Sequence, residues 1–326
     1  SKATPTITLS ATSGSVVKGR KLTFTEKANV AGKFTNASGT TSVATVSPAS
    51  NSTAVTANTA QTVTVTGVTN GSSIITVKFV PTDTTNYNNA VAKTYTATIL
   101  KSATIPTKSL CVARTYNGSN QQITSATSGT GYTLSGYTQK NAGTHTITAT
   151  LTSGYRWSDN TTGTKTFSCS ISKADPTVTI GSSTWFNSPT YFVSQKASVA
   201  GTFEDTVSDG STSIVQIVSN SKLSVNANAV AMMVLQSNGT GTKNITIKFT
   251  PTDTTNYNIV TRTFTAKSDE TSPVIELNGR ASSTSINNGS GNITIPIKIT
   301  ESHSGITSSD FTANDITVKI GTTTVT

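Results

Sequence analysis

One string of eleven residues occurs twice in the chain with a single change, and this repetition strongly constrains the fold. Residues 78–88 read KFVPTDTTNYN and residues 248–258 read KFTPTDTTNYN. Flanking strings repeat at similar spacing: SKATPTITL at 1–9 returns as SKADPTVTI at 172–180, and KANVAGKF at 27–34 returns as KASVAGTF at 196–203. A unit of about one hundred residues therefore occurs twice, which predicts repeated modules.

Alternation of apolar residues with Thr or Lys predicts strands. Examples are QTVTVTGV at 61–68, THTITATL at 144–151 and NITIKF at 244–249. A period of two is typical of strands buried on one face, and the strong helix formers Glu, Leu, Met and Gln are scarce. The predicted fold class is all-β: tandem immunoglobulin-like antiparallel β-sandwiches in a beads-on-a-string array.

Four domains are expected from the repeat and from the segments that match neither copy. They are an Ig-like domain at 1–100, a small β domain at 101–173, a second copy of the first domain at 174–268, and a short, incomplete Ig-like domain at 269–326. The linkers LKSATIP, KADPT and SDETSP each contain a proline, which limits their freedom.

Each copy of the repeated string is predicted to be the hairpin between the last two strands of a sandwich. A proline ends the first strand, the Asp bonds the turning backbone, and the Tyr ring closes one end of the sandwich. The residues expected in these structural roles are Pro81, Asp83, Tyr87, Pro251, Asp253 and Tyr257. The alternative is that these loops bind calcium. One carboxylate per loop, however, supplies little negative charge for such a site. No metal site and no cofactor are predicted.

The modules resemble known bacterial surface repeats. Residues 4–100 and 175–268 look like bacterial Ig-like (Big-type) repeat domains, which share the final hairpin with an Asp/Asn turn ending in Tyr. Residues 108–173, with RTYNGSNQQI, NAGTHTITATL, GYRW and a closing ISKA, resemble the small MBG-like repeats with a YNG start. Residues 272–326, with SPVIEL and SGITSSDFTANDITVKI, look like the first part of another bacterial Ig-like domain.

The resemblance implies architecture and an extracellular setting rather than a ligand. The expected source is a secreted, cell-wall-attached surface protein of a Gram-positive bacterium. Because SKA stands both at the end of the small domain (172–174) and at residues 1–3, the chain is expected to be an excerpt in which small and large modules alternate.

Two kinds of covalent cross-link are considered, a disulfide and an isopeptide bond. Cys111 and Cys169 fall in the predicted first and last strands of the small domain, so a disulfide is predicted, and its chain-entropy contribution would be roughly 4 kcal/mol. The alternative is two buried thiols. A Lys–Asn isopeptide bond is not expected in the first domain, because its only acids are Glu26 and Asp83 and no suitable triplet stands out.

Catalysis is not predicted. The two histidines, His145 and His303, lie in different predicted domains, and no nucleophile elbow, phosphate loop or paired-carboxylate motif occurs. The chain is therefore expected not to be an enzyme.

Two surfaces are candidates for binding. The net charge of +10 is concentrated in the N-terminal half, where a basic face could attract anionic cell-surface polymers. Its candidate residues are Lys18, Arg20, Lys21, Lys27, Lys33, Arg114, Lys140, Arg156 and Lys165. The alternative for these charges is solubility and protection of sheet edges. No specific nucleic-acid site is expected, because aromatic residues do not alternate with the basic ones.

The second candidate surface is aromatic. The segment STWFNSPTYF at 183–192 contains four aromatic residues that could stack on sugar rings of host glycans or mucin. They are Trp185, Phe186, Tyr191 and Phe192. The alternative is packing in the core or against the small domain upstream.

These observations lead to one leading functional hypothesis and two alternatives. The first is a noncatalytic stalk or spacer in an adhesin, without membrane insertion in this segment and monomeric as a fragment. The second is an adhesive module that itself binds host or bacterial glycans or glycoprotein. The third is an accessory module of a secreted polysaccharide-degrading enzyme.

Overall fold

The described part of the chain is built from strands. The computed structural model describes residues 1–187, 189–219, 222–277, 297–303, 318–320 and 323–325. The helical structure among these residues is limited to one 3-10 turn, η1 (Lys108–Leu110). The chain forms two compact units, Ser1–Ser172 and Lys173–Thr326. The prediction of an all-β chain with tandem antiparallel sandwiches is confirmed.

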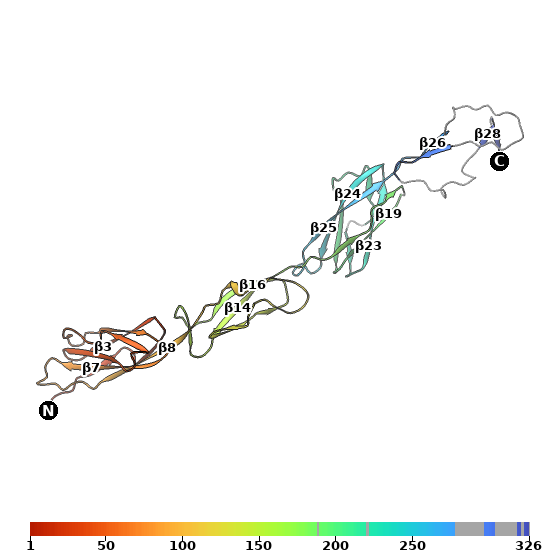
Figure 1. Ribbon diagram of the computed structural model, residues 1–326. Coiled ribbons are helices and arrows are strands. Elements are labelled where there is room, and N and C mark those ends of the chain that lie inside the picture. The colour runs from red at the N-terminus through yellow and green to blue at the C-terminus, as the bar shows by residue number, and fades with distance from the viewer. Residues whose placement is uncertain (188, 220–221, 278–296, 304–317, 321–322, 326) are drawn as a thin grey trace. The chain divides into compact units, whose positions relative to one another are not determined.

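The first unit begins with an immunoglobulin-like sandwich (Figure 1). Its strands are β1 (Ile7–Leu9), β2 (Ser13–Val17), β3 (Lys21–Ala28), β4 (Gly32–Ser38), β5 (Ala44–Ser47), β6 (Gln61–Gly67), β7 (Gly71–Pro81) and β8 (Lys93–Ala103). One sheet has the order β1-β3-β6-β5, and the other contains β8-β7-β4 with β2 parallel to β8. These are the ABED and GFC sheets of the immunoglobulin fold, with an extra strand beside the last one.

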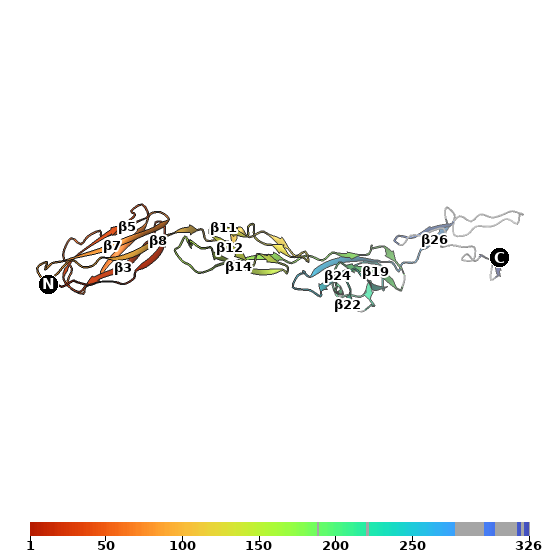
Figure 2. The same cartoon turned by 90° about the horizontal axis from the view of Figure 1, so that it is seen from below.

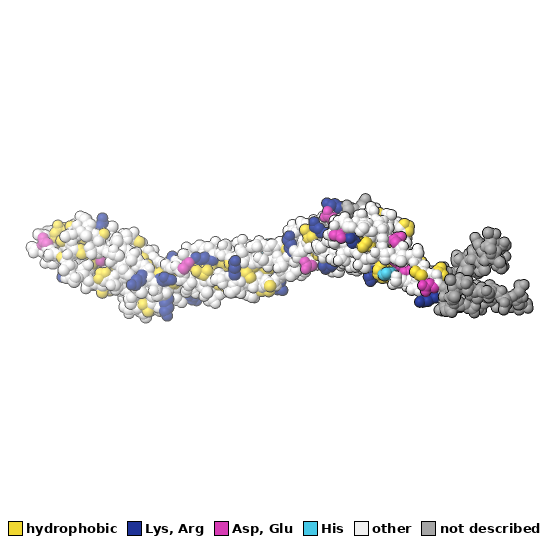
Figure 3. All heavy atoms as spheres, turned by 90° about the horizontal axis from the view of Figure 1, so that it is seen from above, with side chains coloured by type: hydrophobic (Ala, Val, Ile, Leu, Met, Phe, Trp, Pro, Cys, Tyr) yellow, Lys and Arg dark blue, Asp and Glu magenta, His cyan; other side chains and the backbone are white. Residues whose placement is uncertain are grey.

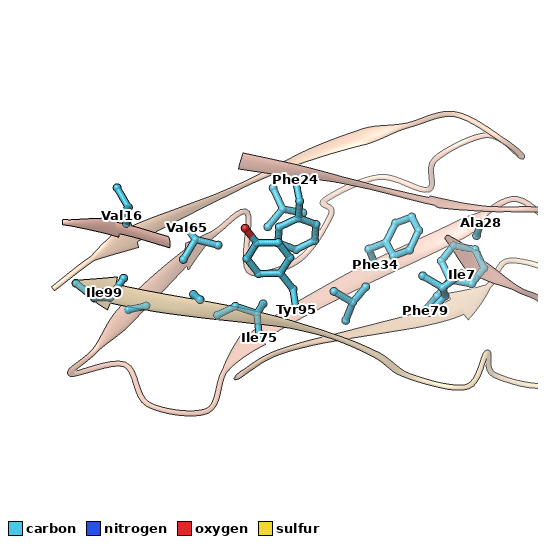
Figure 4. Close-up of a cluster of buried hydrophobic side chains, with 14 residues drawn as sticks. Ile7, Val16, Phe24, Ala28, Phe34, Val65, Ile75, Phe79, Tyr95 and Ile99 are labelled. Atoms are coloured by element: carbon cyan, nitrogen blue, oxygen red, sulfur yellow. The ribbon is translucent and has the colours of Figure 1, made fainter. Parts of the chain in front are cut away.

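Alternation along each strand places one row of side chains between the two sheets. Phe24 stacks on Tyr95 with ring centroids 4.2 Å apart, and Phe34 packs against Phe79 at 4.8 Å (Figure 4). Gly32 is required at the start of β4, because a Cβ there would collide with the carbonyl oxygen of Val80. The equivalent glycine in the second copy of the repeat has the same close backbone approach, which explains the repeated AGKF and AGTF strings.

The small domain completes the first unit with its own core. Its strands are β9 (Arg114–Thr115), β10 (Gln121–Gln122), β11 (Ser128–Gly129), β12 (Tyr132–Ser135), β13 (Thr138–Gln139), β14 (Gly143–Leu151), β15 (Tyr155–Trp157) and β16 (Lys165–Ser172). The main sheet has the order β11-β12-β14-β16-β9, and β10 pairs with β13. Trp157 is fully buried and packs with Ile147, Ala149 and Ile171 in this core.

The second unit contains the repeat of the first sandwich. Its strands are β17 (Val178–Ile180), β18 (Trp185–Phe186), β19 (Tyr191–Ala197), β20 (Gly201–Val207), β21 (Val215–Ile217), β22 (Lys222–Val225), β23 (Val230–Ser237), β24 (Gly241–Pro251) and β25 (Val260–Ser268). The sheets β17-β19-β23-β21 and β18-β25-β24-β20-β22 follow the strand order of the first sandwich. Phe203 packs against Phe249 at 4.8 Å, as Phe34 does against Phe79.

Much of the expected fourth domain lies outside the described residues. The described strands there form two pairs, β26 (Val274–Leu277) with β27 (Ile297–Thr300) and β28 (Val318–Ile320) with β29 (Thr323–Val325). The described chain thus has three separate hydrophobic cores, while the division into four domains stays a prediction.

Candidate functional site

The repeated string forms a turn organised by its aspartate. Asp83 Oδ1 accepts hydrogen bonds from the backbone N–H groups of Thr85 and Asn86, both at 3.0 Å, and Oδ2 accepts from Asn86 Nδ2 at 2.7 Å. These bonds, above all those from Asn86, hold the pKa of Asp83 below its usual range. Asp253 accepts from the backbone and side chain of Asn256 in the same way, at 3.1 and 2.8 Å. The carboxylate oxygens thus serve the turn itself.

The same turn forms hydrogen bonds to the segment that enters the sandwich. In the first copy, Ala3 N–H donates to Asn86 O and Asn88 N–H donates to Ala3 O, both at 2.9 Å. Lys2 Nζ donates to the carbonyl oxygen of Thr84 at 2.7 Å. These contacts hold the entering Ser-Lys-Ala tripeptide against the turn, and we call the arrangement the linker clamp.

The second copy of the linker clamp has the same bonds. Ala174 N–H donates to Asn256 O and Asn258 N–H donates to Ala174 O, both at 2.9 Å, and Lys173 Nζ donates to Thr254 O at 2.6 Å. The two repeated strings, SKA and TDTTNYN, are therefore partners in space. Both repeats are visible in the sequence, but their contact is not. The available signal was that they recur together.

The repeated prolines lie just before this turn, and the repeated tyrosines lie at its end. Pro81 and Pro251 are buried at the last positions of β7 and β24. Tyr87 and Tyr257 are half-buried, and each forms a parallel bridge to the alanine of the clamped tripeptide. An open hollow beside Tyr87 is lined by Val30, Ala31, Thr82, Asp83 and Tyr87.

The connection from the first sandwich to the small domain is a continuous strand. The end of β8 passes the boundary expected at residue 100, and Ala103 is fully buried in the core of the small domain. β15 pairs in parallel with this end, with Tyr155 opposite Lys101 and Trp157 opposite Ala103. Figure 2 shows β8 leaving the first sandwich in this direction. The expected linker LKSATIP thus begins as a strand, because its first residues are paired on β15.

Side chains from both modules reinforce this connection. Arg156 donates from Nη2 to Ser15 Oγ at 2.9 Å and from Nη1 to Asn160 O at 3.1 Å. Asn160 Oδ1 accepts from the backbone N–H of Val17 at 3.2 Å, and Arg20 Nη2 donates to Ser158 O at 3.3 Å. The RW of GYRW therefore has two roles: Trp157 fills the core of the small domain and Arg156 reaches the first sandwich.

These contacts change the interpretation of the basic face. Besides Arg20 and Arg156, Arg114 donates to Gln122 O at 3.0 Å, Lys33 donates to Ser52 O at 3.1 Å, and Lys165 forms an ion pair with Asp159 at 2.7 Å. Basic side chains on the face shown in Figure 3 lie singly or in small groups among uncharged ones. Five of the nine basic candidates therefore bind parts of the chain itself.

Cys111 and Cys169 are joined by a disulfide within the small domain, with their Cα atoms 5.4 Å apart. Cys169 lies on β16 and is 2% exposed. Cys111 directly follows η1 rather than lying in a first strand. Its backbone forms an isolated antiparallel β-bridge with Thr124. The bond ties the start of the small domain to its last strand.

The four aromatic residues at 185–192 do not lie on one surface, and two of them pack in the core, which is the alternative given above to a sugar-stacking platform. Phe186 is buried and stacks on Tyr191 at 4.6 Å. Both rings therefore belong to the packing of the sandwich built from β17–β25, which we call the third sandwich because it is the third module of the chain. Phe192 is 57% exposed on the opposite face of β19, because successive side chains of a strand alternate. Trp185 lies 4.4 Å from the ring of His303. It therefore contacts a residue far downstream within its own unit.

His303 also belongs to the group of three potential metal ligands found among the described residues. The ligand atoms of Asp269, Glu301 and His303 lie within 4.8 Å of one another. Asp269 Oδ1 already accepts a hydrogen bond from the backbone N–H of Thr271 at 3.0 Å. No helix in the described ranges is long and apolar enough to cross a membrane.

Comparisons with known proteins give distant structural likenesses. No family model and no curated protein matches the chain. Invasin, described as a bacterial integrin-binding protein, is 12% identical over 85% of this chain and 63% of its own, with a TM-score of 0.30. The adhesin InvE of Yersinia pseudotuberculosis is 12% identical over 80% of this chain and 58% of its own, with a TM-score of 0.20.

The D00–D0 domains of intimin are 9% identical over 79% of this chain and 98% of their own, with a TM-score of 0.21. At these identities and TM-scores the likenesses carry no argument about function. The immunoglobulin-like topology of the two large sandwiches rests on their own strand order.

Proposed function

We propose that the chain is a noncatalytic, extracellular segment of a bacterial surface protein and acts as a stalk or spacer in an adhesin. The observation that carries this proposal is the connection at β8, where one strand belongs to the sheet of the first sandwich and to the core of the small domain. A spacer must hold the direction of the chain from one module to the next. A paired strand does so better than a free linker.

The pairing of the terminal strands supports the same role. In the first sandwich β2 runs parallel to the final strand β8 over five residue pairs, and in the third β18 runs parallel to β25. Tension applied through the two ends of a module pulls such parallel strands past each other. All hydrogen bonds between them are then loaded together, rather than one after another. The resemblance to Big-type and MBG-like repeats agrees with a surface protein.

The linker clamps add a second kind of restraint. Lys173 and Ala174 are bound to the third sandwich by its turn, so the chain enters that sandwich in a fixed direction. The same bonds in the first sandwich show that this entry is a property of the repeated module.

The test is the freedom of the small domain relative to the first sandwich. Spin labels at the exposed positions Lys78 and Lys140 of the full chain report the distance between these modules. We expect a narrow distance distribution in the wild-type background and a broad one in the double variant Arg20→Ala, Arg156→Ala. Arg114→Ala, which removes an arginine that bonds within the small domain, is the matched control and should stay narrow. A broad distribution without the junction substitutions would contradict the stalk.

The adhesive alternative has one specific observation in its favour. The outer face of β19 and β23 exposes Phe192, Val230 and Met232, at 57%, 62% and 44%. The first sandwich has Thr23 and Thr62 at the positions of Phe192 and Met232. An exposed apolar surface of this kind can bind another protein. Saturable binding of a host glycoprotein at physiological salt that is lost in Phe192→Ala would favour this alternative over the stalk.

A further inference from the structure

A carboxyl group and an amide face each other between the sheets of the first sandwich. Glu26 on β3 is fully buried and Asn36 on β4 is 3% exposed, so the pair joins one sheet to the other. Asn36 Nδ2 donates to Glu26 Oε1 at 3.1 Å and to Pro48 O at 3.2 Å. These two acceptors fix the orientation of the amide, because turning it over would point its oxygen at a carbonyl oxygen.

Two oxygen atoms of this pair have no hydrogen-bond partner within the described structure. They are Glu26 Oε2 and Asn36 Oδ1. Both are acceptors when Glu26 is ionised, so neither can satisfy the other. A proton on Glu26 Oε2 changes this, because the O–H can donate to Asn36 Oδ1 while Oε1 continues to accept from Nδ2. The acid and the amide then form a closed pair with two hydrogen bonds.

The third sandwich contains the same pair in reversed order. Gln195 on β19 and Asp205 on β20 occupy the positions of Glu26 and Asn36, and both are buried. Gln195 Nε2 donates to Asp205 Oδ1 at 2.8 Å, and Gln195 Oε1 is without a partner in the described part of the chain. Both residues have changed between the two copies, yet each copy keeps one acid and one amide.

We propose that each sandwich carries one buried carboxylic acid in its neutral, protonated form, paired with an amide of the facing sheet, and that this acid–amide pair is a pH-sensitive lock between the sheets. Loss of the proton breaks the hydrogen bond to the amide oxygen and leaves an uncompensated charge between the sheets. Such a charge is costly unless it is paired.

Among the described residues, the first sandwich has no buried basic side chain that could compensate that charge. The lysines of the strands around Glu26 are exposed: Lys21, Lys27, Lys33, Lys78 and Lys93. The strands β1, β2, β5 and β6 contain no charged residue. Tyr95 is the other buried titratable side chain of this core, and it stacks on Phe24. Neither Glu26 nor Asp205 takes part in an ion pair within the described residues.

The electrostatics agree with the geometry. Burial raises the pKa of Glu26 from 4.5 to about 7, against the lowering effect of the hydrogen bond from Asn36. Burial raises the pKa of Asp205 in the same way, against the hydrogen bond from Gln195. A carboxyl whose pKa is higher in the folded than in the unfolded state binds its proton more tightly when folded. The sandwich therefore loses stability as the pH rises from about 4.5 to 7.

The composition of the first sandwich makes the test selective. Residues 1–100 contain no histidine, and their other acid, Asp83, has a lowered pKa and titrates below this window. The experiment follows the side-chain carboxyl carbons of the full-length chain by NMR between pH 3 and pH 9. It also follows amide exchange in β3 and β4, corrected for the intrinsic exchange rate. We expect Glu26 to titrate near pH 7 and the protection of β3 and β4 to fall about a hundredfold between pH 5 and pH 8.

Two variants make the outcome decisive. Glu26→Gln keeps the pair neutral at every pH and should abolish the fall in protection. The double substitution E26Q with N36D recreates the order found in the third sandwich and should restore it. The proposal is overturned by titration of Glu26 near pH 4.5, or by a fall in protection that is equally large in the wild type and in Glu26→Gln. If the variants do not fold, the wild-type titration alone decides.

Discussion

The hydrogen bond from Arg156 to Ser15 allows a direct test of whether the first sandwich and the small domain stabilise each other. The bond spans the two modules at 2.9 Å and is partly buried. A hydrogen bond to a charged donor contributes about 1.5 to 3 kcal/mol when it is well shielded. Partial exposure lets water replace some of this, so we expect a coupling free energy of about 1 kcal/mol between the two side chains.

The assay is urea unfolding of the small domain in the full chain. Trp157 is fully buried there, and Trp185→Phe removes the second tryptophan, so fluorescence reports Trp157 alone. A double-mutant cycle compares Ser15→Ala, Arg156→Ala and both together. Ser15 belongs to the first sandwich, so any effect of Ser15→Ala on the Trp157 transition is transmitted through the junction.

The matched control is Ser10→Ala. Ser10 lies in the same sandwich, and its Oγ accepts an exposed hydrogen bond from the backbone N–H of Thr25 at 2.8 Å, so this bond stays within the first sandwich. It should leave the Trp157 transition unchanged. The reasoning is refuted if the effects of Ser15→Ala and Arg156→Ala add within about 0.3 kcal/mol, which is the behaviour of independent sites.

Three further predictions concern the disulfide, the linker clamp and the buried acid. Replacing both Cys111 and Cys169 with Ala should lower the stability of the small domain by about 4 kcal/mol, from a chain separation of 58 residues, measured as the shift of the Trp157 urea transition. A shift of less than about 1 kcal/mol would show that the chain-entropy account fails there. Asp253→Asn removes the carboxylate that orders the turn and should speed hydrogen exchange at the amide of Ala174, while exchange in the third core stays slow. In the native chain the same exchange should rise only at acid pH, because the carboxylate's lowered pKa keeps its contribution until the pH falls through it. The first sandwich should lose on the order of 3 kcal/mol between pH 4.5 and 7 through Glu26, and a stability that is flat over this range would contradict the assignment.

The period-two alternation was sufficient to predict the fold class, and the repeated string was sufficient to predict the hairpin. KFVPTDTTNYN contains its own explanation, because Pro81 ends a strand and Asp83 bonds residues only two and three positions away. Local chemistry of this kind is visible in a sequence. The linker clamp could not be predicted from the sequence, because Ala3 and Asn86 are far apart in the chain. Periodicity carries no information about contacts between such distant residues.

The structure differs from the sequence-based expectations at the junction and in the aromatic segment, for different physical reasons. Ala103 continues the alternation of Tyr95, Ala97 and Ile99, but the polar residues at 101 and 102 made the segment look like a linker. The ring of Trp185 contacts His303, more than a hundred residues downstream, and no local pattern in the sequence indicates such a contact. Glu26 is one of only two acids in its domain, but the sequence around it does not indicate that its side chain is buried beside Asn36.

The strand that crosses from the first sandwich into the small domain also bears on how the chain meets proteases. Lys101 is exposed and would be a trypsin site in a free linker, but its backbone is paired with Tyr155 of β15. A protease has to bind an extended, unpaired segment, so cleavage there requires the sheet to open first. If a protease reaches the chain, the connection between these two modules is protected by the same kind of strand pairing as the strands inside each module.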